Sequence, residues 1–231
     1  MNPVWDYTIQ DIKTVSDEIL KELTVIMNRD CQPGKFTLAE VRDRFAKTMD
    51  ILYIKEGKTY IHFMLIDIFN KHKTVYLHDV CVSTVYRGQG IFKKALQYLS
   101  KYYQKKGFHT ITLDASDSTK EAGLDQKARI AIFAKAGFRI NPKTEAWDEN
   151  GEFIILDTKV LLDSGKVVTI LKNIKDTTYS VKYSNGIVST VEIGEIKRCY
   201  GLNDEYVSCP MSQTILAKNG GKKRKTRKTR K

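Results

Sequence analysis

VCVSTVYRGQGIF, from Val80 to Phe92, decides the fold, because in this stretch an apolar strand passes through a glycine-containing loop into a helix. Thr74 to Ser83 is β-branched and apolar enough for a buried strand, and from about Gln89 apolar residues recur with the spacing of an amphipathic helix. The first amides of a helix have no intrahelical partner and lie at the positive end of its dipole. The loop from Arg87 to Gly90 therefore predicts a site for an anion such as a pyrophosphate.

The residues around this loop resemble a known family. LHDVCVSTVYRGQG, ending at Gly90, resembles the fourth strand and coenzyme A loop of the GNAT superfamily of N-acetyltransferases, whose signature is Arg/Gln-x-x-Gly-x-Gly/Ala. Arg87 and Gly90 match, whereas Phe92 stands where the family usually has Gly or Ala. QKARIAIFAKAGFRI, from Gln126 to Ile140, resembles the family's second signature, with Phe133 at its aromatic position. The resemblance covers roughly residues 4–157.

The resemblance implies the fold and the co-substrate. The fold would be α/β (α+β), with a mixed, splayed central sheet and flanking helices. Acetyl-coenzyme A would lay its pantetheine arm along the fourth strand and its pyrophosphate on the loop that follows. The cofactor-binding residues implied in this way are Val80, Cys81, Val82, Arg87, Gly88, Gln89, Gly90, Ile91, Phe92 and Phe133.

Acetyl transfer to an amine requires an uncharged nucleophile and a proton for the departing thiolate. His78 lies where some polyamine-type members carry a glutamate, and imidazole changes protonation near neutral pH. On a regular strand Asp79 would face the opposite side, so only a bulge brings both side chains into one cleft. We predict His78 and Asp79 as the catalytic residues, with water as the alternative base. Phe133 replaces the tyrosine that serves many members as the acid, and phenylalanine cannot donate a proton.

The residues after Asp157 change to short β-rich runs. Lys166–Leu171, Tyr179–Tyr183 and Ile187–Ile193 have the composition of strands, and Asn185-Gly186 is a hairpin turn signal. We therefore expect an acetyltransferase domain at 1–157 and a small β-barrel at 158–216, similar to a Tudor domain in the spacing of its strands. Three tyrosines in this segment either line a cage for a methylated lysine or form the core of the barrel. They are Tyr179, Tyr183 and Tyr200.

Residues 217–231 form a basic tail that buries too little apolar surface to fold, so we expect disorder. Lys222 to Lys231 carries eight basic and no acidic residues, which leaves +4 of the net charge of +12 (12 minus 8) for the remainder. This charge density predicts nucleic-acid binding through counterion release, and the run resembles a nuclear localisation signal. A purely solubilising tail is the alternative.

The composition restricts the class of protein. A chain of 231 residues can hold one ordinary domain and a small second one. The four cysteines show neither a Cys-x-x-Cys pair nor metal-ligand spacing, so we expect no metal and a reducing setting in the cytoplasm or nucleus. No apolar run reaches the roughly 20 residues that span a bilayer, and the N-terminus lacks the pattern of a signal peptide, so we expect no membrane partner.

These observations predict an acetyl-CoA-dependent N-acetyltransferase that modifies a primary amine, on a protein associated with nucleic acid. The acceptor pocket is expected between residues 28–36 and 141–151. The second of these loops contains three acidic residues and a tryptophan, a combination that would suit the binding of a cationic amine. They are Glu145, Trp147, Asp148 and Glu149. One alternative is a polyamine or other small-amine acetyltransferase. Another is a non-catalytic adaptor that binds nucleic acid or chromatin, which the phenylalanines at 92 and 133 favour.

Overall fold

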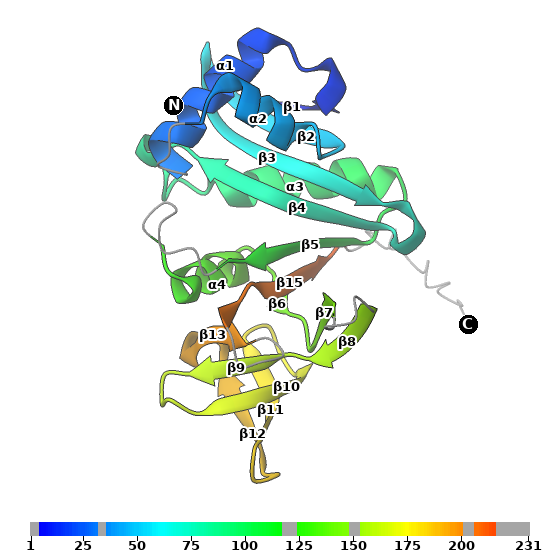
Figure 1. Ribbon diagram of the computed structural model, residues 1–231, viewed down its shortest axis with the longest axis vertical. Coiled ribbons are helices and arrows are strands. Elements are labelled where there is room, and N and C mark those ends of the chain that lie inside the picture. The colour runs from blue at the N-terminus through cyan, green and yellow to red at the C-terminus, as the bar shows by residue number, and fades with distance from the viewer. Residues whose placement is uncertain (1–4, 32–35, 117–123, 148–152, 201–205, 216–231) are drawn as a thin grey trace, which may run out of the picture.

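The computed structural model describes residues 5–31, 36–116, 124–147, 153–200 and 206–215, and its centre is a seven-stranded sheet (Figure 1). The strand order is β1-β2-β3-β4-β5-β15-β6, and only β4 and β5 pair in parallel. The strands are β1 (Asp6–Asp11), β2 (Asp50–Glu56), β3 (Thr59–Phe69), β4 (Thr74–Val82), β5 (Thr110–Ala115), β6 (Arg139–Ile140) and β15 (Cys209–Thr214). The predicted mixed α/β fold is confirmed.

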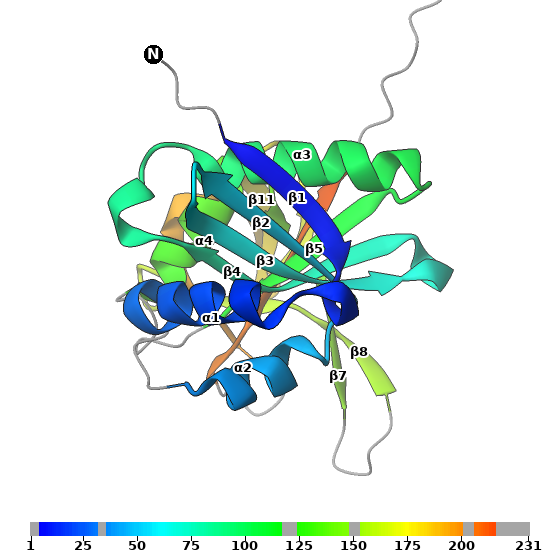
Figure 2. The same ribbon diagram turned by 90° about the horizontal axis from the view of Figure 1, so that it is seen from above.

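Helices cover both faces of this sheet (Figure 2). On one face lie α1 (Asp17–Ile26), the π-helical turn η2 (Met27–Cys31) and α2 (Leu38–Phe45), and on the other lie α3 (Ile91–Lys105) and α4 (Gln126–Lys135). Short 3₁₀ turns complete the chain: η1 (Ile12–Thr14), η3 (Asn70–His72), η4 (Thr84–Tyr86) and η5 (Ile193–Glu195). Each face of the sheet has its own apolar core, so neither group of helices is peripheral.

Local sequence signals explain where α2 begins and which face of α3 packs on the sheet. Thr37 caps α2 and forms the reciprocal capping box with Glu40 that the sequence predicted. In α3, buried residues follow the helical period at Ala95, Leu96, Leu99 and Tyr103, so one stripe of the helix packs on the sheet. Capping residues and the spacing of apolar residues thus account for these two helices.

A second, antiparallel sheet has six strands in the order β12-β11-β10-β9-β13-β14. These strands are β9 (Lys159–Leu162), β10 (Val167–Asn173), β11 (Thr178–Tyr183), β12 (Val188–Glu192), β13 (Ile196–Tyr200) and β14 (Tyr206–Val207), and a separate hairpin consists of β7 (Lys143–Trp147) and β8 (Phe153–Asp157). The predicted Asn-Gly turn joins β11 to β12, with Gly186 at φ +87°. Among the described residues β12 and β14 do not pair, so this sheet is open and is not the closed Tudor-like barrel expected.

The chain returns from the second sheet to the first. The predicted boundary assigned residues 158–216 to a separate unit, whereas β15 pairs with β5 along its whole length, from Cys209 opposite Ala115 to Thr214 opposite Thr110. The reason is that β5 is a buried strand whose second edge needs a hydrogen-bonding partner. The second sheet is therefore an insertion between β6 and β15. Tyr179 is fully buried at the junction, where its hydroxyl accepts the Ile140 amide at 3.1 Å, as a core residue and not as part of an open cage.

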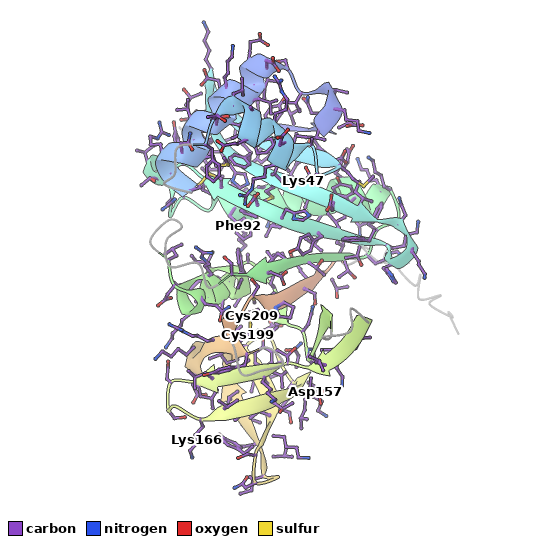
Figure 3. All side chains as sticks on the ribbon, viewed as in Figure 1. Lys47, Phe92, Asp157, Lys166, Cys199 and Cys209 are labelled. Atoms are coloured by element: carbon purple, nitrogen blue, oxygen red, sulfur yellow. A yellow bond between two sulfur atoms is a disulfide. The ribbon has the colours of Figure 1, made fainter. Side chains whose placement is uncertain are left out.

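The four cysteines lie in two pairs, which the sequence did not predict. Cys31 at the end of η2 forms a disulfide with Cys81 on β4, and Cys199 forms one with Cys209, at the junction of the two sheets (Figure 3). The Cα atoms lie 5.7 Å and 5.3 Å apart, within the range that a disulfide spans. Sequence spacing did not reveal the first pair, because its members are 50 residues apart and meet only after folding. No helix in the described part of the chain is long and apolar enough to cross a membrane.

Candidate active site

The site lies where β4 and β5 separate. Their parallel register runs from Thr74 opposite Thr110 to Leu77 opposite Leu113 and extends no further. His78 and Asp114 are the first residues beyond the last pair. The opening between the two strands is a cleft of about 520 Å³ that reaches the start of α3 and one side of α4.

The cleft gathers nearly all the residues predicted from the sequence. Gln89 is the exception, and its side chain donates to the Val85 carbonyl instead. The predicted residues that line the cleft are His78, Asp79, Val80, Cys81, Val82, Arg87, Gly88, Gly90, Ile91, Phe92 and Phe133. Their roles remain predictions, but a single cavity now connects them.

The loop before α3 has the geometry of an anion site. Gly90 caps the helix in the left-handed conformation at φ +74°, and Gly88 is also left-handed at φ +79°. A Cβ atom added at either glycine would meet no atom within 4 Å, so the space beside the first helical amides is open. Four basic side chains line the same cleft, namely Arg87, Lys93, Arg129 and Lys135. These features fit the phosphates of coenzyme A.

Arg87 also has a structural contact. Its Nε donates to the Val82 carbonyl at 3.2 Å, and its terminal nitrogen donates to the Asp30 carbonyl. The guanidinium therefore links η2 to the end of β4, while its charge stays at the cleft. Nearby, the Asn28 amide exchanges two hydrogen bonds with the backbone of Phe36, at 2.8 and 3.0 Å, and closes the segment expected to border the acceptor.

The two phenylalanines that depart from the family pattern contact each other. Phe92 and Phe133 have ring centroids 5.6 Å apart, and Phe133 continues to Phe138 at 6.2 Å. Figure 3 shows Phe92 in the space between the ribbons of β4 and α4. Both rings line the cleft as an apolar wall, which is suited to a thioester arm and supplies no proton.

A β-bulge brings both predicted catalytic residues to the cleft. Asp79 pairs with Leu65 and Leu77 with Ile66, so His78 is the extra residue on β4. Asp79 accepts both arms of Arg44 from α2 at 2.8 and 2.9 Å. His78 Nε2 lies 2.5 Å from Asp67 Oδ2. Because an ionised carboxylate can only accept, Nε2 carries a proton, and Nδ1 is the nitrogen that can take up a proton whenever the ring is uncharged.

Two further residues at this end of the cleft did not emerge from the sequence. Tyr76 donates its hydroxyl to Asp114 Oδ2 at 2.8 Å, and its ring lies edge-on to that of His78 at 4.7 Å. Desolvation raises the pKa of Tyr76, and the Asp114 charge raises it further, so the hydroxyl stays a donor. Partial desolvation also raises the pKa of Asp114, against the opposing effects of the Tyr76 hydrogen bond and the His78 charge. An acidic residue ending the buried run TITLD was the available signal.

Other predicted acceptor elements fall outside what can be described. Asp148, Glu149 and the basic tail at 217–231 lie outside the described residues, as do the side chains of Glu145 and Trp147.

The family model for the acetyltransferase (GNAT) family matches residues 18–138, which is more than half of the chain. The chain belongs to the acetyltransferase (GNAT) family. It is an acetyl-CoA-dependent N-acetyltransferase, with acetyl-CoA as co-substrate, as the sequence predicted. The matched segment contains the separated strands, the glycine loop and α4, so the family assignment and the cleft concern the same residues. No curated protein sequence matches the chain.

Solved structures share the fold at low sequence identity. An aminoglycoside 6'-acetyltransferase type Ii is 14% identical with a TM-score of 0.52, over 91% of this chain and 98% of that one. An aminoglycoside 6'-N-acetyltransferase complexed with coenzyme A is 12% identical with a TM-score of 0.51, over the same shares. The ribosomal-protein-S18-alanine N-acetyltransferase from Escherichia coli is 14% identical with a TM-score of 0.49, over 93% and 98%. The first two likenesses support the fold assignment.

Proposed function

We propose that the enzyme acetylates a primary amine on a protein associated with nucleic acid. The observation that carries the proposal is the arrangement of one cleft, with an anion-binding helix start at one end and an imidazole held by a carboxylate at the other. The first end suits the phosphates of the co-substrate, and the second suits the nitrogen that must lose a proton.

The chain would hold the co-substrate mainly through its backbone. The helical amides after Gly90 would bind the pyrophosphate, and the backbone of Val80 to Val82, freed where β4 leaves β5, would pair with the pantetheine arm. Phe92 and Phe133 would pack on the apolar part of that arm. When bound, acetyl-CoA supplies the thioester from which the acetyl group is transferred.

His78 would act as the base through Nδ1. Asp67 holds the opposite ring nitrogen, which fixes the tautomer and orients the ring. Asp79, held by Arg44, would contribute by keeping α2 against the bulge. Since Phe133 carries no hydroxyl, the departing thiolate would take its proton from solvent.

The nucleic-acid part of the proposal rests on charge alone. The ten residues from Lys222 to Lys231 carry eight positive charges, and such runs bind polyanions in a salt-dependent manner. A polyamine is the second candidate acceptor, favoured by the carboxylate of Asp114 that lines the cleft.

The test is to incubate the enzyme with labelled acetyl-CoA and separate panels of polyamines and basic proteins. Label on a basic protein supports the first proposal, whereas label on polyamines alone supports the second candidate. The matched variants are Gly90→Val and Gly186→Val, because both glycines have positive φ and open space around them but only Gly90 is at the cleft. Transfer should be lost in the first variant and kept in the second. Acetyl-CoA binding without transfer to any amine would contradict the proposal and favour the adaptor.

A further inference from the structure

Asp114 stands directly beyond the last pair of the β4/β5 register, where the cleft begins. Its side chain lines the cleft and shares that end with His78, and Tyr76 contacts both residues. In a β-strand, alternate residues share a face, which places the Asp114 side chain on the same face of β5 as Thr112, the residue opposite Tyr76. The carboxylate is therefore beside the predicted base, at the end of the cleft where β4 and β5 separate.

Three carboxylates, those of Asp67, Asp79 and Asp114, lie at this end of the cleft, and each has a different hydrogen-bond donor. Asp79 is neutralised by both arms of Arg44, and Asp67 receives the Nε2–H of His78. Asp114 receives only the uncharged hydroxyl of Tyr76 as a hydrogen-bond donor within the described part of the chain, and no Lys or Arg there forms an ion pair with it. Of the three, Asp114 is the carboxylate that accepts no hydrogen bond from a basic side chain within the described residues, and the nearby His78 acts on it only through space.

We propose that Asp114 binds the ammonium group of the acceptor and directs its nitrogen toward His78 and the thioester. The inference rests on the proposed function, and it narrows the acceptor to an amine that arrives protonated. Asp114 is exposed to solvent at the cleft, so an arriving cation can reach its carboxylate. Tyr76 is then a positioning residue, since its hydroxyl holds Asp114 Oδ2.

The step balances with these groups. The ammonium bound by Asp114 gives one proton to His78 Nδ1, and the uncharged nitrogen attacks the thioester carbonyl carbon. The C–N bond forms, and the C–S bond breaks with its electron pair on sulfur. The nitrogen loses a second proton to solvent, and the thiolate gains one from solvent. The net products are the amide, the free thiol and one proton, which His78 returns to solvent.

The test compares Asp114→Asn with three variants of the full-length chain, using the alkylamine that turns over fastest in the amine panel. Asp114→Asn should raise the KM for that amine roughly 10- to 100-fold, the range expected for losing one charged hydrogen bond. Its KM for acetyl-CoA should stay unchanged. His78→Ala should instead lower kcat with little change in the amine KM. Tyr76→Phe should raise the amine KM by less than Asp114→Asn. Asp163→Asn, which removes an exposed carboxylate that pairs with Lys127 from the turn between β9 and β10, should change neither constant.

A second measurement separates charge recognition from structural damage. The n-butyltrimethylammonium ion keeps the positive charge but cannot be acetylated, so its inhibition constant reports binding alone. That constant should rise in Asp114→Asn in parallel with the amine KM. If Asp114→Asn kept both constants within twofold while the unmutated enzyme acetylated the amine, the inference would be overturned and the proposed function would stand. If the unmutated enzyme bound acetyl-CoA but acetylated no amine, the proposed function itself would fail, and the inference with it.

Discussion

His62 should make the folded protein sensitive to mild acid. Its side chain on β3 is completely buried, and Nδ1 lies 2.5 Å from the Cys81 carbonyl. Since a carbonyl can only accept, Nδ1 carries the proton, and Nε2 has no partner in the described structure. Burial lowers the pKa of His62 from 6.5 to about 4, against the raising effect of the Cys81 hydrogen bond. The ring is therefore held neutral inside the sheet.

The size of the effect follows from linkage. Below pH 6.5 the unfolded chain binds a proton at His62 that the folded protein does not, so the free energy of unfolding falls as the pH falls, until the folded pKa is reached. A difference of about 2.5 pKa units corresponds to a loss of about 3 kcal/mol in total. About 2 kcal/mol of this should be lost between pH 7 and pH 5.

The assay is urea unfolding at pH 7, 6 and 5 for the unmutated protein, His62→Gln and His72→Gln. The side chain of His72 is exposed in η3, so this variant controls for loss of an imidazole at the surface. His62→Gln should be less stable at pH 7 but should lose about 2 kcal/mol less between pH 7 and pH 5. The reasoning is refuted if all three proteins lose the same free energy of unfolding over that interval.

Three further predictions concern the cleft, a disulfide and the tail. Acetyl-CoA at 100 times its Kd should stabilise the unmutated protein by about 2.7 kcal/mol, which raises Tm by roughly 5–10 °C, and Gly90→Val should abolish the rise while Gly186→Val keeps it. Cys31→Ser should lower the free energy of unfolding, measured with urea, by about 4 kcal/mol, because it removes a disulfide that closes a loop of 50 residues. Equal urea midpoints for the unmutated protein with and without reductant would contradict this. Deleting residues 222–231 should weaken DNA or RNA binding and flatten its salt dependence in titrations, while leaving acetylation of a small amine intact; undiminished binding would assign nucleic-acid recognition to the folded part.

Local physics determined the part of the site that we propose binds the co-substrate. The strand, the glycine loop and α3 follow from β-branched composition, from glycines needed at positive φ and from apolar periodicity, all of which act over a few residues. The capping box at Thr37 and the turn at Asn185-Gly186 were predictable for the same reason. In each case the residues that cause the structure are neighbours in the sequence.

Only the tertiary structure decided the end of the cleft where we propose that the acceptor binds, and the path of β15. Tyr76 meets Asp114 across 38 residues, and Cys31 meets Cys81 across 50, because sheet pairing and helix packing bring them together. The bulge at His78 arises from the register with β3, which the sequence of β4 alone does not specify. The insertion of β15 beside β5 depends on a strand edge created more than ninety residues earlier. Such contacts are set by which surfaces must be buried and paired in the whole fold, and no short-range pattern carries that information.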